Sequence, residues 1–220
     1  MVQIKTIFNG IIGGFMISIG GTVMLSSPNP YVGAFMFTTG LYIILTHKFG
    51  LFTGKVCEVP NHKPVYLIEV FMTILGNLIG TFIFASLLLP TRIGGALSAA
   101  ALDVVALKLS DSPLSTFIMS VLCGLLVCLA IYTYRACTEA GNHFGAALGV
   151  FTCIPLFILC GFNHCVADMY YLFLLPEAGI WTVGGMRLLG GMTSYLLLVI
   201  LGNSVGCMLL PFLKKVKLLP

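Results

Sequence analysis

Six long apolar segments constrain what this 220-residue chain can fold into. A helix needs roughly 20 apolar residues to cross the hydrocarbon of a bilayer. Segments close to that length occur at about residues 7–27, 31–47, 65–90, 113–137, 144–175 and 188–213. Only 8% of the residues are charged, whereas about 25% are charged in a soluble domain. The sequence therefore predicts an all-α integral membrane protein with six transmembrane helices.

Two of these segments are irregular. The second ends in the partly polar stretch Leu45–Lys55, and the fifth is too long for one span and carries His164 and Asp168 within an apolar run. Irregular backbone at membrane depth is tolerated only where it is buried in protein or lines a watery cavity, and ionisable residues there mark pathways or sites. We therefore expect the second and fifth helices to be broken, the fifth at Gly161, and both breaks to line one pathway.

The third and sixth segments share a Gly-Asn-x-x-Gly signature, at Gly76–Gly80 and Gly202–Gly206. A three-helix unit that occurs twice must reverse its orientation in the membrane, which is the layout of many transport proteins. Small residues also let helices approach closely, so the signature has two interpretations, helix packing and internal symmetry. The symmetric interpretation predicts one channel domain over residues 1–220, with inverted repeats at about 7–90 and 113–213.

The charges predict the orientation and exclude some partners. Placing both termini inside puts more Lys and Arg on the cytoplasmic side than outside, as membrane proteins generally do; the inside group is Lys5, Lys63, Arg135, Lys214, Lys215 and Lys217, and the outside group is Arg92, Lys108 and Arg187. A net charge of +4, scattered along the chain, does not suggest nucleic acid. The small residues of the connection 91–112 indicate a short interfacial helix there.

The sequence lacks the motifs of several other classes. The eight cysteines form neither a Cys-x-x-Cys pair nor a zinc spacing with histidine, so we expect neither a metal nor a cofactor. No His-Glu-x-x-His or Gly-x-Ser-x-Gly motif is present, which argues against an intramembrane enzyme with catalytic residues. A water or glycerol channel remains an alternative on architecture alone, although the paired Asn-Pro-Ala signature is absent.

The motifs in both breaks resemble those of the formate/nitrite transporter family. The similarity covers about residues 7–213, and it is carried by Gly50-Leu-Phe-Thr-Gly54, Gly161-Phe-Asn-His164 and the two Gly-Asn-x-x-Gly copies. The resemblance implies an aquaporin-like protomer in a homopentamer, each protomer with its own pore, in a bacterial inner membrane. It also implies transport of a small anion such as formate, nitrite or hydrosulfide.

The same resemblance implies roles for individual residues. His164 matches the central pore histidine, Thr53 the loop threonine that faces it, and Lys108 the vestibule lysine, while Asn163 precedes the histidine in the matched motif. The matched constriction residues are Phe37, Leu41, Leu51, Phe52 and Phe157. Two positions depart from the family pattern, which commonly has asparagine where this chain has Asp168 and Gly124.

The chemistry of the expected site follows from the charge of its substrate. A small carboxylate is anionic at neutral pH, and an apolar constriction would exclude it by its desolvation cost. Lys108 and the backbone amides of the broken helices are expected to offset that cost. His164 can either donate a hydrogen bond or hand over its proton. Asp168 either faces His164 and favours its charged form, or it points into a subunit contact.

Overall fold

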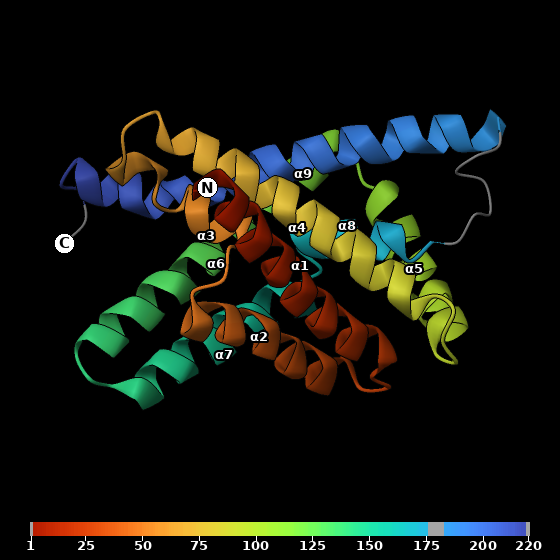
Figure 1. Cartoon of the computed structure of the whole chain (residues 1–220), viewed down its shortest axis with the longest axis horizontal. Helices are drawn as coiled ribbons and strands as arrows, with labels where there is room; N and C mark the ends of the chain where they lie inside the picture. The colour runs from red at the N-terminus through yellow and green to blue at the C-terminus, as the bar shows by residue number, and fades with distance from the viewer. Residues whose placement is uncertain (1, 176–182, 219–220) are drawn as a thin grey trace.

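The computed structural model describes residues 2–175 and 183–218, with the backbone alone for Val2 and 183–190. Every regular element in these ranges is helical (Figure 1). The elements are α1 (Val2–Ser26), α2 (Pro30–His47), α3 (Phe52–Val56), the 3-10 helix η1 (Val59–Asn61), α4 (Tyr66–Leu88), α5 (Gly94–Leu109), α6 (Pro113–Glu139), α7 (His143–Leu159), α8 (Cys165–Phe173) and α9 (Val183–Lys215).

Four of the described helices, α1, α4, α6 and α9, are long and apolar enough to cross a membrane. The helix α2 and the segment Phe52–Asn61 pass the same test as one unit bent by 51°, which gives up to five spans. The helix α7 is apolar but has only 17 residues. The chain is therefore an integral membrane protein, as the sequence predicts.

Local sequence explains where α2 begins and ends. Its N-cap is Asn29, whose side chain accepts hydrogen bonds from two backbone amides of the first turn, and Pro30 follows at N1, where the missing N–H costs no hydrogen bond. It ends at Lys48, which has a left-handed backbone with φ of 58° and donates its N–H to the carbonyl of Ile44. This conformation closes many helices, although glycine usually occupies it.

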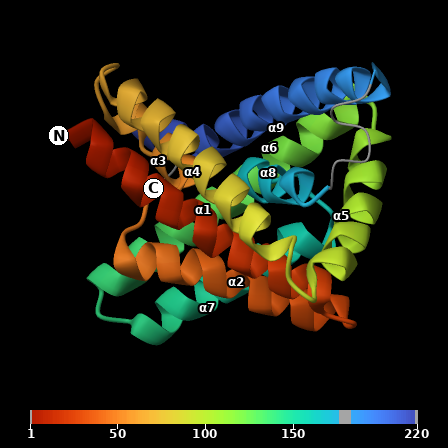
Figure 2. The same cartoon turned by 45° about the vertical axis from the view of Figure 1, so that its right-hand side comes forward.

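Glycines allow two helix pairs to pack closely. The helix α1 packs against α4 and α6 packs against α9, and the pairs lie side by side in Figures 1 and 2. A Cβ added at Gly76 or Gly80 would meet the backbone of α1, and one added at Gly206 would meet that of α6. The packing interpretation of the Gly-Asn-x-x-Gly signature is therefore correct for its glycines.

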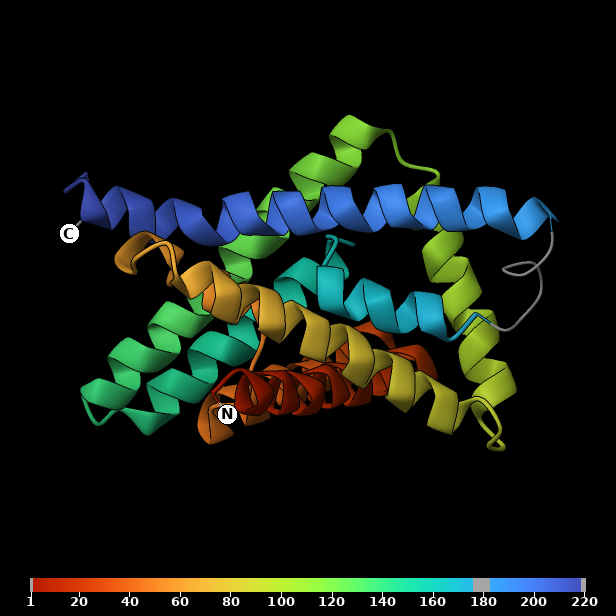
Figure 3. The same ribbon diagram turned by 45° about the horizontal axis from the view of Figure 1, so that its top comes forward.

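Both expected interruptions are present. The chain leaves the helix between α2 and α3, and again between α7 and α8, where Gly161 has a φ of 69°. Figure 3 shows α8 between α4 and α9, and all residues from Cys165 to Leu172 are buried. The expected helix in the connection 91–112 is α5. The side chain of Arg187, used to predict the orientation, lies outside the described residues.

Candidate functional site

An asparagine of α4 fixes the first interruption. The Asn77 side-chain oxygen accepts a hydrogen bond from the Phe52 amide at 2.9 Å. Its nitrogen donates to the carbonyl oxygens of Gly10, at 2.7 Å, and Gly50, at 2.9 Å. Asn77 is fully buried. One side chain thus ties α1, the interruption and the start of α3 together.

An asparagine of α9 does the same for the second interruption. The Asn203 oxygen accepts a hydrogen bond from the Cys165 amide at 2.8 Å. Its nitrogen donates to the carbonyl oxygens of Ser120 and Asn163, both at 2.8 Å. Asn203 is also fully buried. The two asparagines of the signature therefore make the same three hydrogen bonds. Each accepts one from the first residue of a short helix, and donates one to a carbonyl of the interruption and one to a carbonyl of a neighbouring long helix.

The two interruptions bring His164 and Thr53 together in the interior. His164 Nε2 lies 3.5 Å from Thr53 Oγ1, and neither side chain is more than 3% exposed. His164 is also the N-cap of α8, because its Nδ1 accepts a hydrogen bond from the Ala167 amide at 3.2 Å. An accepting Nδ1 carries no proton, so the neutral ring bears its hydrogen on Nε2. That N–H is directed toward Thr53, at the upper limit of a hydrogen-bond distance.

Three cavities lie in series around His164. An outer cavity of about 360 Å³ is lined by His164, Phe37 and Phe157 together with Lys108, Asp111 and Asp168. The first three residues also line a small central chamber. The chamber shares Leu41 and Leu51 with an inner cavity of about 560 Å³. Shared lining means that the two phenylalanines separate the outer cavity from the chamber, and the two leucines separate the chamber from the inner cavity.

The aromatic rings at the outer constriction contact one another. The Phe157 ring is stacked on the His164 ring, with centroids 5.7 Å apart, and meets the Phe37 ring edge to face at 6.1 Å. The role of Phe52 at a constriction stays a prediction. The residue is buried but lines none of the three cavities. Its amide donates a hydrogen bond to Asn77, and its neighbour Leu51 lines both the chamber and the inner cavity.

Lys108 and Asp168 form a buried ion pair beside the outer cavity. Lys108 Nζ lies 2.9 Å from Asp168 Oδ1, and the two side chains are only 12% and 2% exposed. The ammonium also donates to Asn163 Oδ1 at 3.0 Å, and Tyr195 donates its hydroxyl hydrogen to Asp168 Oδ2 at 2.8 Å. Neither expectation for Asp168 included this partner. Its carboxylate is balanced by Lys108, and Asp168 also lines the outer cavity.

The backbone amides expected to bind the anion are partly occupied. The first amides of the two short helices, those of Phe52 and Cys165, donate to Asn77 and Asn203. The Ala167 amide donates to His164. These three N–H groups are therefore bonded within the protein, whereas His164 and Lys108 line the outer cavity and Thr53 lies beside His164.

Three residues hold the site in place through contacts that the sequence did not predict: Tyr195, Asn77 and Asn203. The paired Gly-Asn-x-x-Gly signature pointed to both asparagines, but it did not indicate what they bind. Tyr195 had no signal, because a tyrosine in an apolar segment is most simply a helix-packing residue. Its partner Asp168 lies 27 positions away in the sequence.

The chain is similar in sequence to known membrane transport proteins. The sequence model of the formate/nitrite transporter family matches residues 2–215. The nitrite transporter NirC of Salmonella typhimurium is 30% identical over 84% of this chain and 70% of its own length. The formate channel FocB of Escherichia coli is 26% identical over 67% of this chain and 54% of its own length.

A solved structure shows the same fold. A pentameric formate channel with formate bound superposes with a TM-score of 0.78 at 20% sequence identity, and the match covers 99% of this chain and 97% of that one. Nothing in these relatives supports a water or glycerol channel, and they are channels and transporters, not enzymes. With nearly its whole length matched, the chain belongs to the formate/nitrite transporter family.

Proposed function

We propose that this protein is a channel or proton-coupled carrier for small monovalent anions of weak acids, with formate as the first substrate to test. The observation that carries the proposal is the series of three cavities, in which His164 lines both the outer cavity and the central chamber. The phenylalanine pair and the leucine pair bound that chamber. Any solute that crosses must pass the imidazole.

The polar groups of the pathway suit a small anion. An anion that enters the apolar chamber loses most of its hydration, which costs several kcal/mol unless donors replace the water. The Nε2–H of His164, which lines the chamber, and the hydroxyl of Thr53, 3.5 Å from that nitrogen, are two such donors. Lys108 lines the outer cavity, so its positive charge lies near the approach to them.

The capping role of His164 favours hydrogen-bond donation over proton transfer. To become an imidazolium, the ring must add a proton at Nδ1, and that nitrogen already accepts the Ala167 N–H. Protonation therefore breaks a helix cap, which costs about 1 kcal/mol, and leaves the N–H facing a second N–H. This supports the channel form of the proposal, in which the anion is bound at Nε2–H and released without exchange of a proton.

Nitrite is the second candidate substrate. The relative at 30% identity is a nitrite transporter, whereas the matched formate channels are less similar in sequence. Hydrosulfide remains a third candidate, since all three are small monoanions that the same donors can bind.

The proposal includes an assembly and a topology. Residues 1–220 form one channel domain of six spans, with inverted repeats at about 7–90 and 113–213. The matching bonds of Asn77 and Asn203 support that symmetry. The protein is a homopentamer in the lipid bilayer of a bacterial inner membrane, with both termini in the cytoplasm. The pentamer rests on the structural relative, and native mass spectrometry of the purified protein tests it.

Flux measurements test the proposed function. Purified protein in liposomes should take up labelled formate, and unlabelled nitrite and hydrosulfide should compete. His164→Phe should abolish this uptake, because it removes Nε2–H and fills the chamber. Wild-type liposomes that pass glycerol but no anion would contradict the proposal. Uptake that drives stoichiometric alkalinisation outside the liposomes would establish the proton-coupled form.

A further inference from the structure

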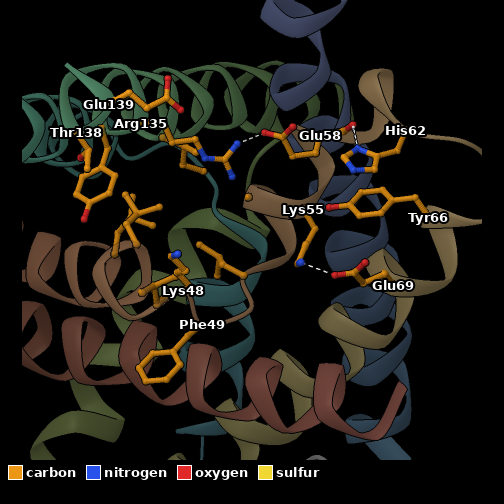
Figure 4. Close-up of a pocket in the computed structure, with 17 residues that line it drawn as sticks. Lys48, Phe49, Lys55, Glu58, His62, Tyr66, Glu69, Arg135, Thr138 and Glu139 are labelled. Atoms are coloured by element: carbon orange, nitrogen blue, oxygen red, sulfur yellow. Dashed lines mark hydrogen bonds and ion pairs between the residues drawn. The ribbon is translucent and has the colours of Figure 1, made fainter. Parts of the chain in front are cut away.

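The inner cavity is lined by charged residues that are mostly paired. Lys55 Nζ lies 2.5 Å from Glu69 Oε1, and Arg135 forms an ion pair with Glu58. Figure 4 shows both pairs on the cavity wall. The two remaining charged side chains of the lining are Lys48 and Glu139, and neither is in an ion pair among the described residues. Lys55 and Arg135 are thus each ion-paired with a carboxylate, whereas Lys48 is not.

The backbone holds Lys48 in a conformation that lysine rarely adopts. Its φ of 58° and ψ of 35° lie in the left-handed region, which is unfavourable for residues with a Cβ. The flanking rings of His47 and Phe49 stack on each other with centroids 5.5 Å apart. The Lys48 and Phe49 amides both donate to the carbonyl of Ile44. These contacts fix the turn, so the position of Lys48 is set by the fold.

The turn places Lys48 next to the inner constriction. It lies three residues before Leu51, which with Leu41 separates the inner cavity from the chamber. In Figure 4 the ammonium of Lys48 points into the cavity. Glu139 is the last residue of α6 and belongs to a different wall in that view. A residue in a strained conformation whose charge faces a pathway indicates a functional constraint.

We propose that Lys48 is the anion-recruiting residue of the cytoplasmic mouth, where it gathers a small monovalent anion in front of the Leu41–Leu51 constriction. This inference rests on the proposed function. It assigns the inner mouth a lysine that is in no ion pair among the described residues, whereas Lys108 of the outer cavity is ion-paired with Asp168. Anion entry from the cytoplasm is then steered by charge, and its rate falls as salt screens that charge.

Substitutions at Lys48 separate its charge from its backbone role. Glycine and asparagine both accept a left-handed backbone, so Lys48→Gly and Lys48→Asn remove the charge without straining the turn. Lys48→Arg keeps the charge. Lys63→Asn is the matched control, because Lys63 is an exposed lysine of the connection between η1 and α4 and does not line the cavity.

The measurement is the initial rate of formate and nitrite entry into inside-out vesicles, which present the cytoplasmic mouth, at low and high ionic strength. At low salt, Lys48→Gly and Lys48→Asn should be slower than wild type by about fivefold, the factor that corresponds to two unit charges about 4 Å apart in water. Lys48→Arg and Lys63→Asn should match wild type. At high salt the differences should disappear, and thermal unfolding of Lys48→Gly should occur no lower than in wild type.

The possible failures are distinguishable. Wild-type vesicles that pass neither anion would refute the proposed function itself. If wild type transports but Lys48→Gly and Lys48→Asn are equally fast at low salt, Lys48 recruits no anion and the proposal is wrong. Equal losses in Lys48→Arg and Lys48→Gly would also overturn it, because the effect would then not follow the charge.

Discussion

At the scale of single residues, the buried Lys108–Asp168 pair contains one of the two positions, Asp168, at which the sequence departs from the pattern of the family. Burying two charges is costly, and their attraction compensates only when both remain in place. Here Asn163 and Tyr195 complete the bonding of the pair. Removing one partner therefore leaves an uncompensated charge in the outer cavity wall.

This arrangement predicts a strongly coupled pair of substitutions. Asp168→Asn and Lys108→Met should each lower the free energy of unfolding by about 3 kcal/mol. The double variant should lose clearly less than the sum, because no unpaired charge remains. Tyr195→Phe should lose about 1.5 kcal/mol, as expected for a hydrogen bond to a charged group. Thermal or denaturant unfolding in detergent checks the cycle, and additive losses would show that the ion pair does not hold in solution.

At the scale of elements, the positions of the two short helices are set by the asparagines at the interruptions more than by the stability of the short helices themselves. The helix α3 has 5 residues and α8 has 9, and isolated helices of that length are unstable. Their positions depend on packing and on the bonds made by Asn77 and Asn203. The facing geometry of Thr53 and His164 is consequently set from α4 and α9.

Alanine substitution tests this dependence. Asn77→Ala and Asn203→Ala each remove three hydrogen bonds and should each destabilise the protein by about 3 kcal/mol, at about 1 kcal/mol per bond, with loss of formate flux. Asn142→Ala is the control: this exposed asparagine caps α7, so its loss should cost about 1 kcal/mol and leave flux intact. If Asn203→Ala conducts like wild type, α8 is held by other contacts.

The sequence predicted the broken elements well and their contacts less well. Apolar length and the polar residues of 45–55 and 158–168 indicate where helices cross and break, because both follow from the cost of polar groups in hydrocarbon. The partner of Asp168 could not be found in this way, since Lys108 lies on the separate helix α5. Long-range pairings such as this one depend on tertiary packing.

At the scale of the whole molecule, the outer and inner cavities lie on opposite sides of the central chamber. Free cysteines can therefore report which side of the membrane each cavity faces. Cys160 is exposed and lines the outer cavity, whereas Cys57, Cys123, Cys128, Cys153, Cys165 and Cys207 are buried. With both termini in the cytoplasm, Cys160 should face the outside.

Labelling checks this orientation. In right-side-out vesicles, a membrane-impermeant maleimide should modify Cys160, and the signal should disappear in Cys160→Ser. Cys137, in the last turns of α6, should react only in inside-out vesicles. Labelling of Cys160 from the cytoplasmic side alone would reverse the proposed topology.

The size of the central chamber also has an energetic consequence for the cell. Its volume of about 10 Å³ is close to the least space that one water molecule requires. Apart from His164, the side chains that line the chamber are apolar and offer that water few partners. A continuous file of water, along which protons hop, is therefore interrupted at this point. In the proposed channel, anions would then cross without a parallel leak of protons through water, which spares the proton-motive force of the cell.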